Sequence, residues 1–294
     1  MIDGALLLDK PVGLSSNAAL QRAKRIYGAA KAGHAGTLDP LASGLLLVLF
    51  GEATKFAGPL LDANKEYLAT VKLGERTATG DAEGVVLEKK DVHLERDQLL
   101  AVLDRFRGEI DQVPPMHSAL KHEGTPLYRL ARRGQEVERA PRRVRISELQ
   151  LTQLQGASLA MRVVCSKGTY IRVLAEDIGA ALACGAHLSA LRRTASGDFR
   201  VEEAVTLQAL EEFRPEERSR RLLPLPALLA GLPRAELGAA EEARLRQGQA
   251  LKISGLRQGL CAVVRADGAV IGLGAADGEG SLRPLRLTHA HPSG

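Results

Sequence analysis

The stretch from Gly33 to Gly44, which reads GHAGTLDPLASG, constrains the backbone of this chain more than any other. Its three glycines allow backbone angles that other residues avoid, and Pro40 fixes one angle of its own. We therefore expect a stiff loop over this stretch, and Asp39 is the carboxylate inside it. A loop residue held by a rigid scaffold is a common way to place a catalytic group. The alternative is that Asp39 and Pro40 only form a turn.

Hydrophobic patterns on both sides of this loop predict strands and helices in no regular order. A helix is expected from residue 16 to 27, because Ser15 or Ser16 can cap its start and Gly28 can end it. Further helices are predicted at 99–106 and 170–183, and strands at 5–8, 45–50, 67–73, 144–154 and 159–166. There is no regular βα repeat and no GxGxxG or GxxxxGK[ST] loop, which counts against a nucleotide-cofactor fold.

The last part of the chain has the pattern of a separate small domain. Residues 214–233 are rich in Pro, Arg and Glu, which is typical of a linker. Beyond them we expect a helix at 236–248 and short strands at 251–253, 260–265, 269–273 and 283–287. The sequence therefore predicts a larger domain over residues 1–225 and a β-rich domain over residues 232–290.

Several classes of protein do not fit this sequence. Its cysteines lack CxxC spacing and are odd in number, which argues against a disulfide framework and a zinc site; they are Cys165, Cys184 and Cys261. No apolar run approaches the roughly 20 residues of a membrane span, and the N-terminus lacks a signal-peptide pattern. We expect a cytoplasmic protein that needs no metal and no cofactor.

The charge distribution suits a polyanionic partner. The net charge is +5, and residues 129–145 carry seven arginines among seventeen residues. A single cluster of this kind is more often a solvated face, but several clusters on a basic protein favour phosphate binding. Aromatic residues are few, with no Trp, four Tyr and five Phe. Recognition of a nucleic acid would therefore depend on shape and phosphate contacts more than on base stacking.

The motif at residues 33–44 resembles the catalytic motif of the TruB family of tRNA pseudouridine synthases. Further blocks similar to this family occur in the same order as in its members: LLDKPVGLSS at 7–16, GEATK at 51–55, KEY at 65–67, RTATGD at 76–81, SKGTYIR at 166–172, and GAHL at 185–188 continuing to LRR at 191–193. The resemblance is strong over about residues 4–200 and weak over the last sixty. It implies an α+β fold, with a catalytic domain on a mixed, largely antiparallel sheet with flanking helices, and a PUA-like C-terminal domain.

The resemblance also implies a mechanism. The enzyme isomerises uridine 55 in the T loop of tRNA by breaking the N1–C1′ bond, rotating the base and joining C5 to C1′. Asp39 is then the essential carboxylate, acting as a nucleophile at C1′ or C6 or by taking the 2′ proton. Tyr67 stacks on the base near C5, Arg172 pairs with the carboxylate, and Leu191 forms a wall of the pocket. Without the family, these three would be interpreted as a core aromatic, a solvated arginine and a core leucine.

Other residues are expected at the substrate on the same grounds. The family places His34 against the RNA, where it supports the flipped-out nucleotides, although a lone histidine is usually structural. Lys10 buttresses the catalytic loop together with the proline that follows it. Tyr170 and Asp81 lie in family-like blocks and are counted with the substrate-binding residues. The basic segment 129–145, which holds Arg142 and Arg143, is the candidate surface for the T-stem backbone together with Arg192 and Arg193.

The partners follow from the same resemblance. The T arm of tRNA would bind the catalytic domain, and the PUA-like domain would contact the acceptor end. We expect a monomer that requires no protein partner. Relatives that act on rRNA within guide-RNA complexes carry long basic tails and a fuller PUA domain, which this sequence does not show. The other alternative is an RNA chaperone that folds tRNA without needing catalysis; it is compatible with the enzyme, and the intact Asp39 favours catalysis.

Overall fold

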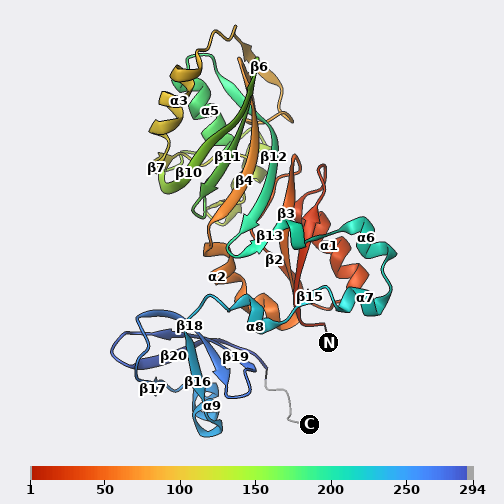
Figure 1. Cartoon of the computed structure of the whole chain (residues 1–294), viewed down its shortest axis with the longest axis vertical. Helices are drawn as coiled ribbons and strands as arrows, with labels where there is room; N and C mark the ends of the chain where they lie inside the picture. Colours follow the sequence, from red (N-terminus) through yellow and green to blue (C-terminus); the bar gives the residue numbers. More distant parts are fainter. Residues whose placement is uncertain (1, 290–294) are drawn as a thin grey trace.

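The computed structural model describes residues 2–289 and contains two separate large sheets (Figure 1). The first sheet has eleven strands. Its main path runs β14 (Val205–Thr206), β1 (Gly4–Lys10), β3 (Ala42–Phe50), β12 (Ala186–Ser196), β4 (Lys65–Leu73), β11 (Ser158–Cys165), β10 (Arg142–Gln155) and β7 (Gly108–Gln112). Three short strands pair at its side: β2 (Ala32–Ala35), β13 (Phe199–Arg200) and β15 (Leu222–Leu223). Most pairs are antiparallel, while β1–β14 and β3–β12 are parallel, so the predicted mixed, largely antiparallel sheet is confirmed.

Short helices flank this sheet. They are α1 (Ser16–Tyr27), α2 (Ala57–Asp62), α3 (Arg96–Arg105), α4 (Leu127–Ala131), α5 (Ile171–Ala181), α6 (Leu207–Glu212), α7 (Pro215–Ser219) and α8 (Leu225–Leu228), with 3-10 turns η1 (Gly51–Phe56) and η2 (Val201–Glu203). Two small hairpins complete this part, β5 (Glu75–Thr77) with β6 (Val86–Lys89), and β8 (Lys121–His122) with β9 (Thr125–Pro126). Helix α1 confirms the prediction for residues 16–27, since the Ser15 hydroxyl accepts from Ala18 N and Gly28 ends the helix at φ 61°.

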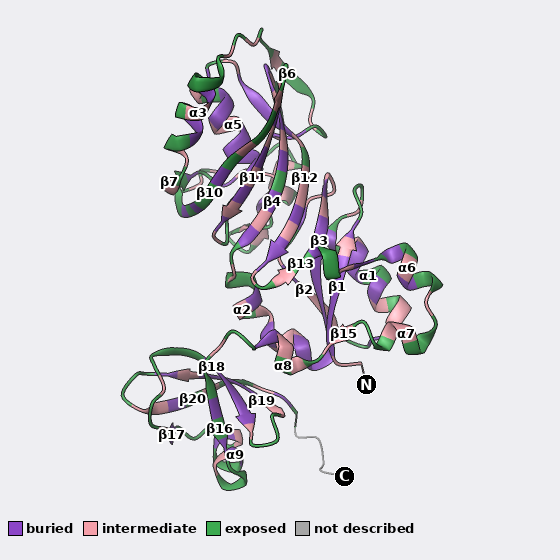
Figure 2. Ribbon diagram, in the orientation of Figure 1, coloured by how far each residue is buried: buried purple, intermediate pink, exposed green. Residues whose placement is uncertain are grey.

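Each half of the eleven-stranded sheet packs against its own hydrophobic core. One core lies under α3 and α5 and is built on β4, β10 and β11; the other packs α1 and α6 against β1 and β3 (Figure 2). Strand β3 is buried along almost its whole length, which fits its run of leucines. The two halves of the sheet meet where β12 pairs with both β3 and β4, and this junction carries the cavity described below.

The second sheet has five strands in the order β16 (Arg234–Leu237), β18 (Gly259–Arg265), β19 (Val270–Ala276), β20 (Ser281–Leu287) and β17 (Leu251–Lys252), with helix α9 (Ala239–Arg246) beside it. The helix predicted at 236–248 is wrong at its start, because residues 234–237 form a strand parallel to β18. Ala235 and Leu237 are buried, while Arg234 and Glu236 are exposed, which is the alternation of a strand.

Residues 214–233 do not form the predicted linker. They contain α7, β15 and α8, and β15 pairs with β1 at the edge of the first sheet. Leu228 and Leu229 are buried in a core that also holds residues of the second sheet. These leucines make the segment part of the packed structure. The predicted domain boundaries at 225 and 232 stay predictions, and the outer ends at residues 1 and 290 lie outside the described residues.

The two sheets are joined by apolar and polar contacts. Phe56 and Leu60 from the first part share a core with Ala262 and Leu273 from the second. In Figure 1 the second sheet accordingly lies against α2 and α8. Within the described residues, no helix is long and apolar enough to cross a membrane.

A polar contact adds to this junction. The Glu52 carboxylate accepts from the His289 backbone N–H at 2.6 Å and from Lys55 Nζ at 2.9 Å. Lys55 Nζ also donates to the Leu287 carbonyl at 2.9 Å, so η1 is fastened to the end of the second sheet.

Candidate active site

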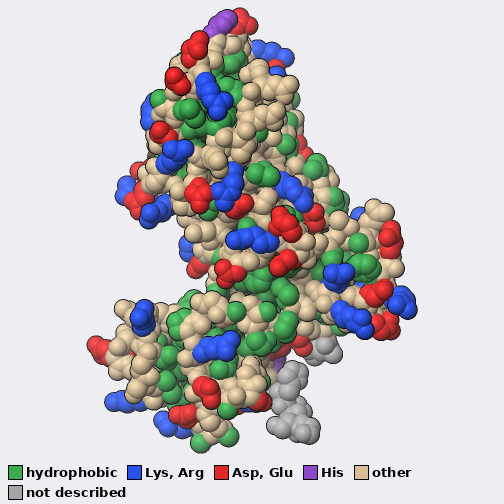
Figure 3. All heavy atoms as spheres, viewed as in Figure 1, with side chains coloured by type: hydrophobic (Ala, Val, Ile, Leu, Met, Phe, Trp, Pro, Cys, Tyr) green, Lys and Arg blue, Asp and Glu red, His purple; other side chains and the backbone are tan. Residues whose placement is uncertain are grey.

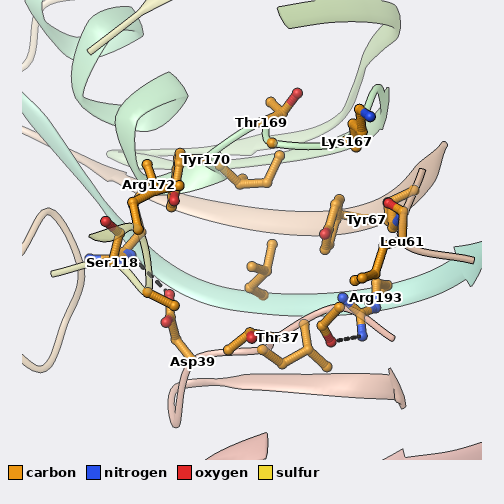
Figure 4. A pocket seen from close by; sticks show the side chains of 18 of the residues that line it. Thr37, Asp39, Leu61, Tyr67, Ser118, Lys167, Thr169, Tyr170, Arg172 and Arg193 are labelled. Carbon is orange, nitrogen blue, oxygen red and sulfur yellow. Dashed lines mark hydrogen bonds and ion pairs between the residues drawn. The ribbon is translucent and has the colours of Figure 1, made fainter. Parts of the chain in front are cut away.

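A cavity of about 580 Å³ opens between the two halves of the first sheet (Figure 4). Its walls come from the loop before β3, from strands β4 and β12, from the segment before β8 and from the start of α5. The polar and aromatic side chains in these walls are Thr37, Asp39, Lys65, Tyr67, His117, Ser118, Ser166, Lys167, Thr169, Tyr170, Arg172 and Arg193. The cavity therefore gathers residues from distant parts of the sequence around Asp39.

The loop that carries Asp39 is held at several points. The predicted loop over residues 33–44 is shorter than expected, because its ends form β2 and the start of β3. Ser16 Oγ accepts from the Leu38 N–H at 2.7 Å and donates to the Leu38 carbonyl at 2.8 Å. The Gly13 N–H donates to the Pro40 carbonyl at 2.7 Å. These bonds fix the backbone on both sides of Asp39.

Asp39 makes an ion pair with Arg172. The distance from Asp39 Oδ2 to Arg172 Nε is 3.0 Å, and the side chains are 42% and 5% exposed. The other guanidinium nitrogens of Arg172 donate to the Thr79 carbonyl at 3.0 Å and to the His117 carbonyl at 2.7 Å. Three anchors therefore hold Arg172 in one orientation, and its charge orients the carboxylate that faces the cavity (Figure 4).

Asp81 is a second carboxylate close to the same guanidinium nitrogen that Asp39 contacts. Its Oδ2 is 3.6 Å from Arg172 Nε, and the side chain is buried and does not line the cavity. Asp81 accepts from the Glu83 N–H at 3.1 Å, within the turn between β5 and β6. The structure thus places Asp81 in the interior beside Arg172, where it offsets part of the buried positive charge and does not border the cavity.

Tyr67 and Leu191 stand on neighbouring strands and both line the cavity. Tyr67 is on β4 opposite Arg193 on β12, and Leu191 is two residues before Arg193. Burial raises the pKa of Tyr67, and the Arg193 guanidinium beside it opposes this rise. The Tyr67 hydroxyl is therefore protonated at neutral pH, and its ring is available for stacking.

Three predicted residues differ in their relation to the cavity. Tyr170 lines the cavity at the start of α5. Lys10 is fully buried outside it and donates to the Pro11 and Leu14 carbonyls at 2.8 and 2.6 Å. Burial lowers the pKa of Lys10 to about 8. His34 lies on β2 and does not line the cavity, and burial together with Arg193 lowers its pKa.

Arg142 and Arg143 lie on the exposed start of β10 and are not among the residues that line the cavity. Arg143 is near two carboxylates, with distances of 3.4 Å to Asp111 and 3.7 Å to Glu109. On the face shown in Figure 3, Lys and Arg side chains are interspersed with Asp and Glu in the same way. Part of the basic charge counted in the sequence is therefore balanced locally.

Two buried cations line the cavity, and the sequence predicted neither of them there. Lys65 was not singled out, and the prediction that Arg193 lies on the T-stem surface is wrong, because its side chain is buried. Arg193 is almost fully buried and donates to the Leu45 carbonyl at 2.7 Å and to the Gly36 carbonyl at 3.0 Å. Lys65 donates to the Leu61 and Ala63 carbonyls, both at 2.6 Å, and burial lowers its pKa to about 8. Both lie in family-like blocks, but nothing in their local sequence shows that their charged ends are enclosed.

The arrangement supports chemistry with one carboxylate in a cavity whose buried charges are otherwise positive. Such a carboxylate can act as a nucleophile or take a proton, and the cations favour negative charge that develops on a substrate. Within residues 2–289, no group of three or more His, Cys, Asp or Glu is placed to hold a metal ion.

Comparison with known proteins identifies similar sequences over nearly the whole chain. Residues 24–171 match the family described as TruB family pseudouridylate synthase (N terminal domain). Residues 172–230 match the tRNA pseudouridylate synthase B C-terminal domain, and residues 233–288 match Pseudouridine synthase II TruB, C-terminal.

Individual relatives agree with these matches. A protein named tRNA pseudouridine synthase B from Azoarcus sp. (strain BH72) is 56% identical over 98% of this chain and 95% of its own length. A protein of the same name from Burkholderia mallei (strain NCTC 10247) is 55% identical over 97% of both chains. Among solved structures, a chain of the archaeal box H/ACA sRNP Nop10-Cbf5 complex superposes with a TM-score of 0.75 at 28% identity, covering 97% of this chain and 85% of that chain.

Proposed function

The chain belongs to the TruB family of pseudouridine synthases, and we propose that it isomerises uridine 55 in the T loop of tRNA to pseudouridine. The observation that carries this proposal is the ion pair of Asp39 with the buried Arg172 at the wall of the cavity. An isomerisation within one nucleotide transfers no electrons and no phosphate. The residues around Asp39 supply what such a reaction needs: a carboxylate, fixed charges and an enclosed space.

Asp39 is the residue that opens the glycosidic bond. It attacks C1′ or C6, or it takes the 2′ proton, and in each route the N1–C1′ bond breaks and its electrons move to the uracil. The base then rotates, C5 bonds to C1′, and the C5 proton leaves to a base. Arg172 keeps the Asp39 carboxylate in place during these steps.

The cavity walls hold the detached base. Tyr67 stacks on the ring and Leu191 closes the other side, which keeps uracil from escaping while it turns. Three buried cations, Lys65, Arg172 and Arg193, border the cavity and favour the negative charge on uracil after the glycosidic bond breaks. The enclosed space also implies that the target uridine is flipped out of the folded T loop, at a cost of a few kcal/mol.

Binding of the rest of the tRNA supplies this energy. We assign the T-stem backbone to the basic segment 129–145, with Arg142 and Arg143 at its end, and we place His34 against the flipped-out nucleotides. The PUA-like domain at 232–290 contacts the acceptor end, and the catalytic domain at 1–225 carries the T arm. A monomer that works on tRNA in the cytoplasm without a protein partner is sufficient for this reaction.

The test uses tRNA transcripts labelled with tritium at C5 of uridine. Formation of pseudouridine releases that tritium, so the purified protein should release one equivalent per tRNA, and chemical mapping should place the product at position 55. A transcript with cytidine at position 55 is the matched control and should release none. Absence of release from the normal transcript, or equal release from the control, would overturn the proposal.

A further inference from the structure

Ser118 carries a hydroxyl group at the cavity that takes no part in the reaction steps proposed above. Ser118 lines the cavity and is 5% exposed. Its Oγ is buried and has no hydrogen-bond partner among the described residues. Buried hydroxyl groups in native proteins are nearly always paired, because leaving one unpaired is costly. A buried hydroxyl that lines a substrate cavity and lacks a protein partner indicates a group that pairs with the substrate.

The backbone around this hydroxyl is fixed. The Ser118 N–H donates to the Met116 carbonyl at 2.9 Å, and its carbonyl accepts from the Tyr128 N–H at 3.0 Å. Ser118 also lies beside Tyr170: burial raises the pKa of Tyr170, and the Ser118 hydroxyl opposes that rise without making a well-formed hydrogen bond. The main chain is therefore satisfied, and only the side chain has hydrogen-bonding capacity to offer.

The position of Ser118 relative to Asp39 limits which group of the substrate the Ser118 hydroxyl can contact. Residue 117, directly before it, accepts through its carbonyl from Arg172, and Arg172 contacts Asp39. In Figure 4, Ser118 accordingly lies at the end of the cavity where Arg172 and Asp39 meet, while Tyr67 lies farther along. A carboxylate that opens the glycosidic bond acts next to C1′. The polar groups nearest C1′ in uridine are the ring oxygen O4′, the ribose 2′-hydroxyl and the uracil O2, and the last two are the stronger hydrogen-bonding groups.

We propose that the Ser118 hydroxyl hydrogen-bonds one of these two groups of the flipped-out uridine, and so helps to position the glycosidic bond at Asp39. This inference rests on the proposed function. Ser118 donates to O2, or it donates to or accepts from the 2′-hydroxyl. Both possibilities share one chemistry, an uncharged hydrogen bond next to the reacting bond, and they differ in which modification of the substrate removes it.

The experiment measures tRNA affinity in an Asp39→Asn background, where no turnover changes the substrate. Three tRNAs are assembled by ligation with uridine, 2′-deoxyuridine or 2-thiouridine at position 55. Dissociation constants are compared between Asp39→Asn and the double variant that also carries Ser118→Ala. Ser219→Ala serves as the control substitution, since Ser219 is an exposed residue of α7.

Loss of one uncharged hydrogen bond should weaken binding of the uridine tRNA about threefold to tenfold. With one of the two modified tRNAs, binding should already be weaker, and Ser118→Ala should then add no further loss. That tRNA identifies the partner group. The melting temperature should fall little on Ser118→Ala, because the hydroxyl makes no well-formed hydrogen bond to the protein and only its contact with Tyr170 is lost.

Three outcomes would overturn the inference. The first is equal affinity with and without the hydroxyl, and the second is the same loss on all three tRNAs together with a lower melting temperature, which would mark a structural role. The third is a same-sized loss on all three tRNAs with unchanged stability, which would exclude both groups. The proposed function is tested separately, by tritium release from the protein without substitutions. Failure of the Ser118 inference would leave that result unchanged.

Discussion

Arg172 Nε lies 3.0 Å from Asp39 Oδ2, and the arginine is the buried member of the pair. Two backbone carbonyls, from Thr79 and His117, accept from the other nitrogens of the guanidinium, and the buried Asp81 carboxylate lies 3.6 Å from Nε. The arginine is therefore fixed by the fold and the aspartate is fixed by the arginine. This order explains how a carboxylate that is partly exposed can keep one orientation toward a substrate.

The first prediction concerns Arg172. Replacing it by Met should lower the single-turnover rate at least a hundredfold, because Asp39 loses the group that orients it. It should also destabilise the domain by about 3 kcal/mol, because the buried Asp81 loses its positive neighbour. The rate and stability of Arg172→Lys should fall between those of the unaltered protein and those of Arg172→Met, since an ammonium cannot reach every partner of the guanidinium. Rates and urea unfolding curves measure both effects.

Arg162→Met is the matched control for this prediction. Arg162 pairs with Glu66 at 2.6 Å on the outer face of β11, and it does not line the cavity. Its loss should leave the rate within about threefold. A folded Arg172→Met protein with a similarly small loss of rate would show that Asp39 does not need its partner.

The second prediction concerns the ring and the hydroxyl of Tyr67. Tyr67→Phe keeps the stacking surface, so the rate should fall less than about tenfold, whereas Tyr67→Leu should lose the 1–3 kcal/mol of base–aromatic stacking as well. Burial raises the pKa of Tyr67 above its usual value near 10, so the hydroxyl does not titrate between about pH 6 and pH 9. The rate–pH profile of Tyr67→Phe should accordingly match that of the unaltered protein in this range. An alkaline limb that disappears in the variant would contradict this assignment.

The third prediction concerns the basic surface. If Arg142 contacts a T-stem phosphate, Arg142→Gln should reduce the slope of log affinity against log salt by about one. Arg143→Gln should have a smaller effect, because Asp111 and Glu109 already offset its charge. Filter binding over a series of salt concentrations measures the slopes. Unchanged slopes in the double variant would place the tRNA footprint elsewhere.

The fourth prediction concerns the junction between the two sheets. Burial by itself raises the pKa of Glu52, but hydrogen bonds from Lys55 and His289 outweigh it and lower the pKa from 4.5 to about 2. A carboxylate with a lowered pKa in the folded state stabilises the fold above its unfolded pKa, and this stabilisation is lost as the pH falls toward about 2. Glu52→Gln should therefore cost about 1–3 kcal/mol at neutral pH, and the difference should shrink below about pH 4.5.

Chemical denaturation of the unaltered protein and of Glu52→Gln at a series of pH values tests whether their stability difference shrinks at low pH. Glu211→Gln is the control, because Glu211 forms an exposed pair with Arg22 and should cost less than about 1 kcal/mol. A stability difference for Glu52→Gln that stays constant from about pH 7 to pH 3 would mean that the charge of Glu52 does not hold the junction.

Much of the fold was predictable where one pattern decides the local structure. Helix α1 has a capping serine and a terminating glycine, and strand β3 is a run of leucines buried on both faces. The predictions failed where a short segment depends on its partner. The segment 234–237 is too short for its sequence to show a hydrophobic period. It becomes a strand only because β18 offers a parallel edge.

The residues of the candidate site also differ in whether the local sequence could predict them. Asp39 could be singled out because the glycines and proline around it are visible in the sequence. Arg193, Lys65 and Ser118 could not, since their importance comes from burial against segments that are distant in the chain. Arg193 faces Tyr67 only because β12 pairs with β4. No local pattern reveals that a charged or hydroxyl side chain will be enclosed by such a pairing.

The most direct test of the central claim is the single-turnover release of C5 tritium by Asp39→Asn. This change removes the charge of the carboxylate and hardly alters its size, so the fold and the phosphate contacts should persist. We expect no measurable turnover, with tRNA affinity within about tenfold of the unaltered protein, or roughly 1.4 kcal/mol. A variant that keeps more than about a hundredth of the normal rate would contradict the assignment of Asp39 as the essential carboxylate.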